Sequence, residues 1–168
     1  MKANSNKDSP LTKTWLHAIE FGARDYWGAL SGDFLRRVYQ RAAQQWLAIQ
    51  MEEAQGVLPL VNSPLEALKA YAQLSFAKGL IQDAEDLGFQ ELPQGGIEVF
   101  AHRCPYKSVC QSLLDGGLSS AELTCPRLGC LVGSFEVFAL PTADYELLEF
   151  QPHGYCRGRI HTPAGCET

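Results

Sequence analysis

The sequence predicts an α+β domain in which N-terminal helices pack against a small antiparallel sheet that ends in a C-terminal β-hairpin. Apolar side chains recur at helical spacing through the first half, whereas short segments of alternating character appear only after about residue 97. A chain of 168 residues fits one domain and can bury a core without disulfides. We therefore expect a flexible N-terminus over residues 1–9, a single domain over 10–162 and a tail over 163–168.

The first helical region carries an apolar stripe that is typical of a helix facing a core. The stripe predicts one long amphipathic helix, or two helices interrupted near Ser31 and Gly32. Its aromatic residues could line a ligand pocket, but packing in the core is the more usual role of such a stripe. The residues at this spacing are Trp27, Leu30, Phe34, Val38, Ala42, Trp46 and Ile49.

The next helix has a clear start signal at Ser63. A proline follows this serine directly and a glutamate stands three residues after it, which is the pattern of an N-cap with proline at the first helical position. We expect this helix to run to about Leu87, with a kink at Gly79 and its stop at Gly88.

A turn at 93–96 separates this helix from the first expected strand, 97–102, in which apolar and polar residues alternate. Cys104 and Pro105 come next and open a short apolar-periodic run that ends at the glycine pair 116–117. Because proline is well tolerated at the first helical position, Cys104 is expected at or beside an N-cap.

The same cysteine–proline pair recurs at Cys125 and predicts a second short helix, stopped by Pro141. The chain then predicts a strand over 144–150, a tight turn at 152–154 and a closing strand over 155–161. These last two strands form the expected hairpin.

Cys104 and Cys125 are the first candidate functional residues. A thiol at a helix N-terminus faces unpaired backbone N–H groups and the positive end of the helix dipole, both of which favour the thiolate. Thiolate is the form that binds metal or attacks carbon. Cys110 and Cys130 lie about 240° and 140° around the helix from their partners at 100° per residue, so we expect them to point elsewhere, into the core.

Cys156 follows a turn and opens the closing strand, which is a usual place for a ligand that must meet residues from distant segments. Together Cys104, Cys125 and Cys156 are the candidate metal ligands, although their spacing matches no compact zinc-ribbon or ferredoxin pattern. The alternative is that these thiols are small buried side chains with no chemistry. Cys166 lies in a Gly- and Pro-containing tail and is discounted first.

A catalytic use of the cysteines needs a base. His102 is close in sequence to Cys104, and His153 lies in the turn before Cys156, so the candidate catalytic residues are Cys104, Cys125 and His102. Further along, Glu146 and Glu149 could supply a carboxylate ligand, but a solvated strand face is the commoner role for such residues.

Charge and hydropathy limit the partners. A net charge of -5 and the lack of a dense Lys/Arg stripe argue against nucleic acid. No window approaches the roughly 20 apolar residues of a membrane span, and the N-terminus lacks the apolar region of a signal peptide. We expect a cytoplasmic protein, whose six cysteines are free thiols or metal ligands rather than disulfides.

Residues 64–162 resemble the 4-vinyl-reductase-type small-molecule-binding domain and the related L-2-amino-thiazoline-4-carboxylic acid hydrolase family. The motifs that carry the resemblance are GLIQDAEDLGFQ, HRCPYKSVCQSLL, TCPRLGCLVGSFEVFAL and PHGYCRGRI. The resemblance implies helices packed on an antiparallel sheet, with an apolar pocket between them and a cysteine-rich site at one end. In the sensor branch of this group three cysteines and a carboxylate hold zinc, which implies a zinc site on Cys104 or Cys125, Cys156 and Glu149. The stretch 145–151 contains no cysteine, so the hydrolase-like arrangement fits somewhat better.

Three functions remain open at this point. The first is a small-molecule-binding domain for an apolar or aromatic ligand, with a zinc site of structural importance. The second is a cysteine- or metal-dependent hydrolase in which Cys104 or Cys125 acts as nucleophile. The third is an iron–sulfur protein with its cluster on Cys104, Cys110, Cys125 and Cys130. The oligomeric state does not follow from the sequence.

Overall fold

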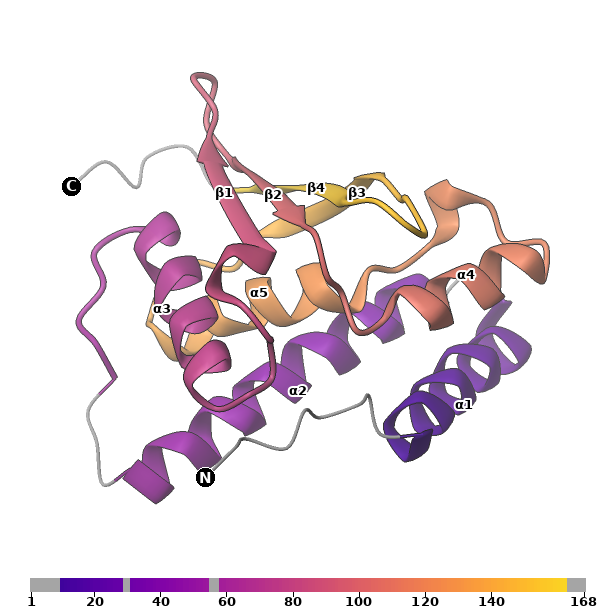
Figure 1. Ribbon diagram of the computed structural model, residues 1–168, viewed down its shortest axis with the longest axis horizontal. Helices are drawn as coiled ribbons and strands as arrows, with labels where there is room; N and C mark the ends of the chain where they lie inside the picture. The colour runs from indigo at the N-terminus through magenta and orange to yellow at the C-terminus, as the bar shows by residue number, and fades with distance from the viewer. Residues whose placement is uncertain (1–9, 29–30, 55–57, 163–168) are drawn as a thin grey trace.

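A layer of helices covers one face of a four-stranded antiparallel sheet in the computed structural model, which describes residues 10–28, 31–54 and 58–162 (Figure 1). This arrangement confirms the predicted α+β class. Within the described residues the helices are α1 (Pro10–Trp27), α2 (Ser31–Ala54), α3 (Pro64–Ala77), α4 (Lys107–Asp115) and α5 (Pro126–Val137), with 3₁₀ turns η2 (Ala84–Asp86) and η3 (Ser120–Glu122). The strands are β1 (Leu87–Glu91), β2 (Ile97–Ala101), β3 (Asp144–Glu149) and β4 (Cys156–His161).

The sheet has the order β1-β2-β4-β3, so β4, the last of the described strands along the chain, is a central strand. Alternate residues of β2 and β4 point toward the helices and are buried, as a sheet with one covered face requires. The register places Ala101 of β2 opposite Cys156 of β4, and Tyr145 of β3 opposite Ile160. This register brings the start of β4 beside the end of β2, where the cysteine-containing loop begins.

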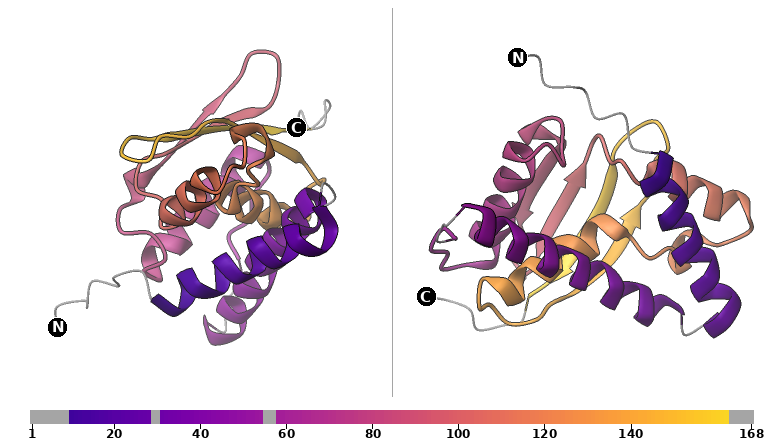
Figure 2. Two further views of the ribbon diagram at one scale, coloured as in Figure 1. Left: turned by 90° about the vertical axis from the view of Figure 1, so that its right-hand side faces the viewer. Right: turned by 90° about the horizontal axis from the view of Figure 1, so that it is seen from below.

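Helix α5 lies between the sheet and α2, as the two views of Figure 2 show. Every residue of α5 from Pro126 to Phe135 is buried, which is expected of a helix with neighbours on both sides. Close packing depends on glycine. A Cβ added at Gly129 would lie 2.6 Å from the Tyr39 Cβ, and one added at Gly133 would lie 2.6 Å from the Gln40 Cα, both on α2.

The first half of the chain follows its sequence signals in part. A helix does start after Ser63, whose Oγ accepts a hydrogen bond from the Glu66 backbone N–H at 3.2 Å. The predicted end near Leu87 is wrong, because α3 stops at Ala77 and Gly79 adopts a left-handed conformation with φ of 75°.

The segment after this helix differs most from the prediction. Residues 87–91 form β1, whose register pairs Gly88 with Phe100 of β2, so Gly88 is a strand residue and not a helix stop. In contrast, the predicted strands near 97–102, 144–150 and 155–161 are confirmed within a residue or two. The expected flexible ends, 1–9 and 163–168, lie outside the described residues. None of the described helices is both long enough and apolar enough to span a membrane.

Candidate thiol site and ligand pocket

Four cysteines line one small cavity between the sheet, α4 and the start of α5. They are Cys104, Cys110, Cys125 and Cys156, and we call the space between them the inner cavity. Its volume is about 20 Å³, which is room for about one water molecule. Apart from these thiols and three other polar or charged side chains, Tyr106, Lys107 and Arg127, the lining consists of apolar side chains and a glycine. These are Val99, Ala101, Pro126, Leu128, Leu147, Phe150 and Gly158.

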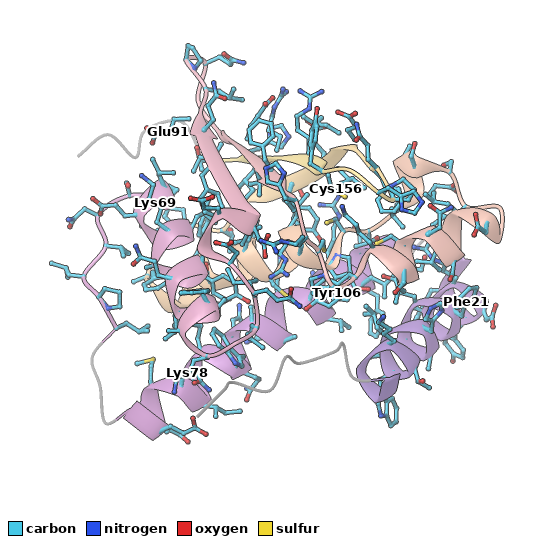
Figure 3. All side chains as sticks on the ribbon, in the orientation of Figure 1. Phe21, Lys69, Lys78, Glu91, Tyr106 and Cys156 are labelled. Carbon is cyan, nitrogen blue, oxygen red and sulfur yellow. The ribbon has the colours of Figure 1, made fainter. Side chains whose placement is uncertain are left out.

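Each cysteine reaches the cavity from a different structural position. Cys125 is the N-cap of α5 with proline at the next position, as the sequence predicts. Cys156 begins β4, Cys110 lies within α4, and Cys104 lies in the loop between β2 and α4. The three residues predicted as metal ligands, Cys104, Cys125 and Cys156, are thus brought together around one cavity. Figure 3 labels two residues of its lining, Cys156 and Tyr106.

The prediction of an N-cap at Cys104 is wrong. Helix α4 begins at Lys107 and its N-cap is Tyr106, so Cys104 stands outside the helix. The helical angle between Cys104 and Cys110 therefore does not apply, which is why Cys110 lines the inner cavity instead of pointing elsewhere.

Cys130 lies apart from the other thiols, as predicted. It is buried on α5, and its Sγ donates a hydrogen bond to the Tyr39 backbone oxygen at 3.6 Å. It does not line the inner cavity, so the structure does not bring together the predicted iron–sulfur set of Cys104, Cys110, Cys125 and Cys130. Cys166 lies outside the described residues.

Burial raises the pKa of three of the cavity thiols, Cys110, Cys125 and Cys156. Loss of solvent raises the pKa of Cys125 to about 12, and the negative charge that Cys104 would carry acts in the same direction. The nearby backbone N–H groups of Leu128 and Arg127 lower the pKa of Cys125, but by less than burial raises it. The predicted easily formed thiolate at this helix start is therefore wrong. Burial also raises the pKa of Cys110 and of Cys156.

Arg127 is a residue of the site that the sequence did not predict. It is only 5% exposed and lines the inner cavity, with its Cζ 5.5 Å from the centre of the Tyr106 ring. No described residue forms an ion pair with it or accepts a hydrogen bond from its side chain, and its buried Nε is without a partner. A guanidinium taken out of water in this way is costly unless an anionic group completes the site.

The neighbours of Arg127 are thiols and phenols rather than carboxylates. Burial by itself would lower the pKa of Arg127, but negative charge on Cys104, and next on Tyr106 and Cys130, holds that pKa above its ordinary value. Burial raises the pKa of Tyr106 and of Cys130, so at neutral pH these two groups are neutral and do not balance the guanidinium charge. The sequence signal for this arginine is its place in α5, where small and apolar residues surround it on all sides.

The donors around the inner cavity are of the type that thiophilic metals prefer, and Arg127 would offset the charge of metal-bound thiolates. Their present arrangement is looser than a formed metal centre. Within residues 10–28, 31–54 and 58–162, no three His, Cys, Asp or Glu side chains are grouped so as to hold an ion.

The predicted carboxylate ligands lie elsewhere. Glu149 accepts a hydrogen bond from Gln151 and forms an ion pair with Arg157, and Glu146 forms an ion pair with Arg159 at 3.8 Å. Neither glutamate lines the inner cavity.

A larger pocket lies on the other side of Cys104, and we call it the outer pocket. Its volume is about 510 Å³, and Cys104, Tyr106 and Lys107 form a wall that it shares with the inner cavity. His102 and His153 both line it, so the two candidate bases are on the same side as Cys104. Its other walls come from α1, the loop after α3 and the hairpin turn.

Lys107 holds two sides of the outer pocket together. Its Nζ donates hydrogen bonds to the backbone oxygens of His102, at 2.8 Å, and of Gly154 in the hairpin turn. One side chain therefore connects the loop that carries Cys104 to the turn before Cys156.

Comparison with protein-family models, curated proteins and solved structures found no match. The resemblance to the 4-vinyl-reductase-type domain therefore stays a prediction, and the function rests on the residues described above.

Proposed function

We propose that this protein is a small-molecule-binding domain whose ligand occupies the outer pocket. The observation that carries the proposal is the pocket itself, because about 510 Å³ lies within the range of roughly 300–1,000 Å³ that is usual for ligand sites. Its lining combines apolar side chains such as Leu16 and Ile81 with polar ones such as Gln82, so that it can contact both the apolar body and the polar groups of a ligand.

The ligand would contact the wall that separates the two cavities. Cys104 is part of this wall and is partly exposed, whereas the other described cysteines are buried. Tyr106 in the same wall is held against Arg127, so a ligand that shifts this wall also acts on the inner cavity.

A pocket-filling substitution tests the proposal. Leu16→Trp places a larger side chain at the pocket wall and should abolish ligand binding, while Leu60→Trp, at a side chain 90% exposed and outside the pocket, is the matched control. The assay is thermal unfolding with a panel of small organic molecules. A ligand at 100 times its Kd stabilises by about 2.7 kcal/mol, which corresponds to roughly 5–10 °C in Tm for a chain of this size. Equal shifts in both variants, or no shift with any compound, would rule out the pocket as the ligand site.

The second candidate function is a metal site on the thiols, with zinc as the metal and Cys104, Cys125 and Cys156 as ligands. The observation that favours it is the four-thiol cavity beside the Arg127 guanidinium, which forms no ion pair with any described residue and whose Nε has no hydrogen-bond partner among them. Metal binding would remove the thiol protons and so supply the negative charge that Arg127 lacks. Cys110 would be the fourth ligand of the zinc ion. If the group were an iron–sulfur cluster instead, Cys156 would replace Cys130 in the predicted set of four cysteines.

Metal analysis of protein purified without added metal tests this candidate. Cys104→Ser, Cys125→Ser and Cys156→Ser should each lower the metal content, whereas Cys130→Ser, in the same helix as Cys125 but outside the cavity, should not. A metal-free parent protein would contradict the proposal.

We also propose a cytoplasmic location. The described cysteines are free thiols, which is the state that a reducing cytoplasm maintains.

Catalysis by Cys104 is the remaining alternative, because Cys104, His102 and His153 line the same pocket. A cysteine-dependent hydrolase would lose turnover in Cys104→Ser while still binding its substrate. Turnover that persists in this variant would exclude Cys104 as the nucleophile.

A further inference from the structure

We infer that the inner cavity of the metal-free protein binds an anion with a single heavy atom, of the chloride or hydrosulfide type, beside Arg127. This anion site lies outside the proposed function, because the proposed ligand occupies the outer pocket. It is the use of the inner cavity when no metal ion is bound to its thiols.

The Arg127 guanidinium is a buried cation without a counterion. Its side chain is 5% exposed and lines the inner cavity, and no described residue forms an ion pair with it or accepts a hydrogen bond from it. A buried ion is stable only when other groups compensate for its lost hydration. A water molecule in the cavity would accept a hydrogen bond from the buried Nε but would leave the charge unbalanced. The guanidinium therefore favours an anion in the cavity.

The carboxylates that act on the cavity thiols are paired with other arginines. These carboxylates are Glu20 and Glu149, and neither of them lines the cavity. Glu20 forms an ion pair with Arg24 at 3.1 Å, and Glu149 forms one with Arg157 at 3.6 Å. No described aspartate or glutamate is part of the cavity wall, so none supplies the charge that would balance Arg127.

The start of α5 adds a second attraction for an anion at the same place. Cys125, the N-cap of this helix, lines the cavity, and its side chain makes no capping hydrogen bond. The backbone N–H groups of Arg127 and Leu128 lie close enough to the Cys125 thiol to affect its pKa. The first N–H groups of a helix and its dipole favour negative charge. The helix start and the guanidinium therefore act on the cavity in the same direction.

The size and the lining of the cavity select the class of anion. A volume of about 20 Å³ is room for about one water-sized particle, so a polyatomic anion such as phosphate, nitrate or a carboxylate is too large. Thiols are weak hydrogen-bond donors, and most of the remaining wall is apolar. Such a lining suits a weakly hydrated ion better than fluoride or hydroxide. Chloride and hydrosulfide meet both conditions.

Stability measured as a function of chloride concentration tests the inference. Urea unfolding is followed in protein treated with a chelator and kept reduced, at constant ionic strength, while sodium gluconate is replaced by sodium chloride. The folding equilibrium constant of the parent protein should rise about tenfold between about 1 and 200 mM chloride, along the saturation curve of one site. Hydrosulfide is the second probe, and the anion that acts at the lower concentration is the preferred ligand. Nitrate, which has the same charge but is polyatomic, should not produce this rise.

Three variants locate the ion. Arg127→Met removes the charge, and Ala101→Val keeps Arg127 but fills the cavity, so each should abolish the dependence on chloride. Arg37→Met removes a positive charge from the exposed surface of α2, outside the cavity, and should keep the dependence of the parent protein. General effects of salt act on all of these proteins alike. If Ala101→Val fails to fold, Arg127→Met and Arg37→Met still decide.

A rise of less than about twofold in the parent protein with both chloride and hydrosulfide would overturn the inference. So would a rise that Arg37→Met reduces as much as Arg127→Met does, or an equal rise with nitrate. None of these results bears on the proposed function, which Leu16→Trp and Leu60→Trp test at the outer pocket.

Discussion

Replacing Arg127 by methionine is expected to stabilise the protein when no metal or ligand is bound. The guanidinium is 5% exposed and has no anionic partner among the described residues, so its desolvation is not compensated. Exchange of buried charges for apolar residues of similar volume typically stabilises by about 1–4 kcal/mol. The variant also loses the contact between Arg127 and the Tyr106 ring, worth about 2 kcal/mol at a desolvated site. The expected net gain is about 0–2 kcal/mol.

The assay is urea unfolding of protein that has been treated with a chelator and dialysed. Arg127→Lys is the control, because it keeps the positive charge and should give no gain. With metal bound, the parent protein should recover the difference, since the metal-bound thiolates of the inner cavity then pair with Arg127.

The reasoning fails if Arg127→Met lowers the free energy of unfolding of the stripped protein by about 1 kcal/mol or more. That result would mean that the guanidinium stabilises the fold by itself, and that no anionic occupant is needed to explain it.

Two further predictions concern packing and pH. Gly133→Ala should lower the free energy of unfolding in urea by about 1–3 kcal/mol, because the new Cβ meets the backbone of Gln40. Gly22→Ala in helix α1, where nothing lies within 4 Å of the new Cβ, should raise it by about 0.5–1 kcal/mol. Equal effects of the two substitutions would contradict the α2–α5 contact. Burial raises the pKa of Cys125 to about 12 and of Cys130 to about 11 from 9.0, so the free energy of unfolding should fall as pH rises above about 9, since only the unfolded chain ionises there. A urea midpoint that is unchanged between about pH 8 and 10.5 would refute this assignment.

Local signals account for much of what the sequence predicted correctly. The start of α3 follows from Ser63 and the proline after it, and the start of α5 from Cys125 with its proline. Both depend on residues adjacent in the chain. The final hairpin likewise follows from alternation and one turn.

The errors arise where tertiary contacts override such signals. Gly88 resembles a helix stop, but pairing with β2 makes it part of a strand, which no local pattern reveals. At the site, Cys104 and Pro105 resemble a helix start, yet α4 begins only after Tyr106. This shift of two residues brings Cys110 to the inner cavity.

The protonation state of the Cys125 thiol could not be predicted from the sequence either. A helix N-terminus favours thiolate at Cys125, but the packing of α5 between α2 and the sheet buries the thiol, and burial has the larger effect on its pKa. Arg127 was not predicted as a site residue because arginine side chains usually lie at the surface. Its burial, which only the structure shows, makes it a candidate residue of the site.

The central position of β4 has a consequence for biosynthesis. Because β4 is the last strand that the structure describes yet lies between β2 and β3, the sheet cannot close until residues 156–161 have left the ribosome. Until then Cys104, Cys110 and Cys125 lack the strand that covers them, and their thiols remain open to oxidants and to free metal ions. The nascent chain is therefore most exposed to oxidation between the synthesis of Cys125 and the pairing of β4. Its thiols are also most accessible to metal ions during this period.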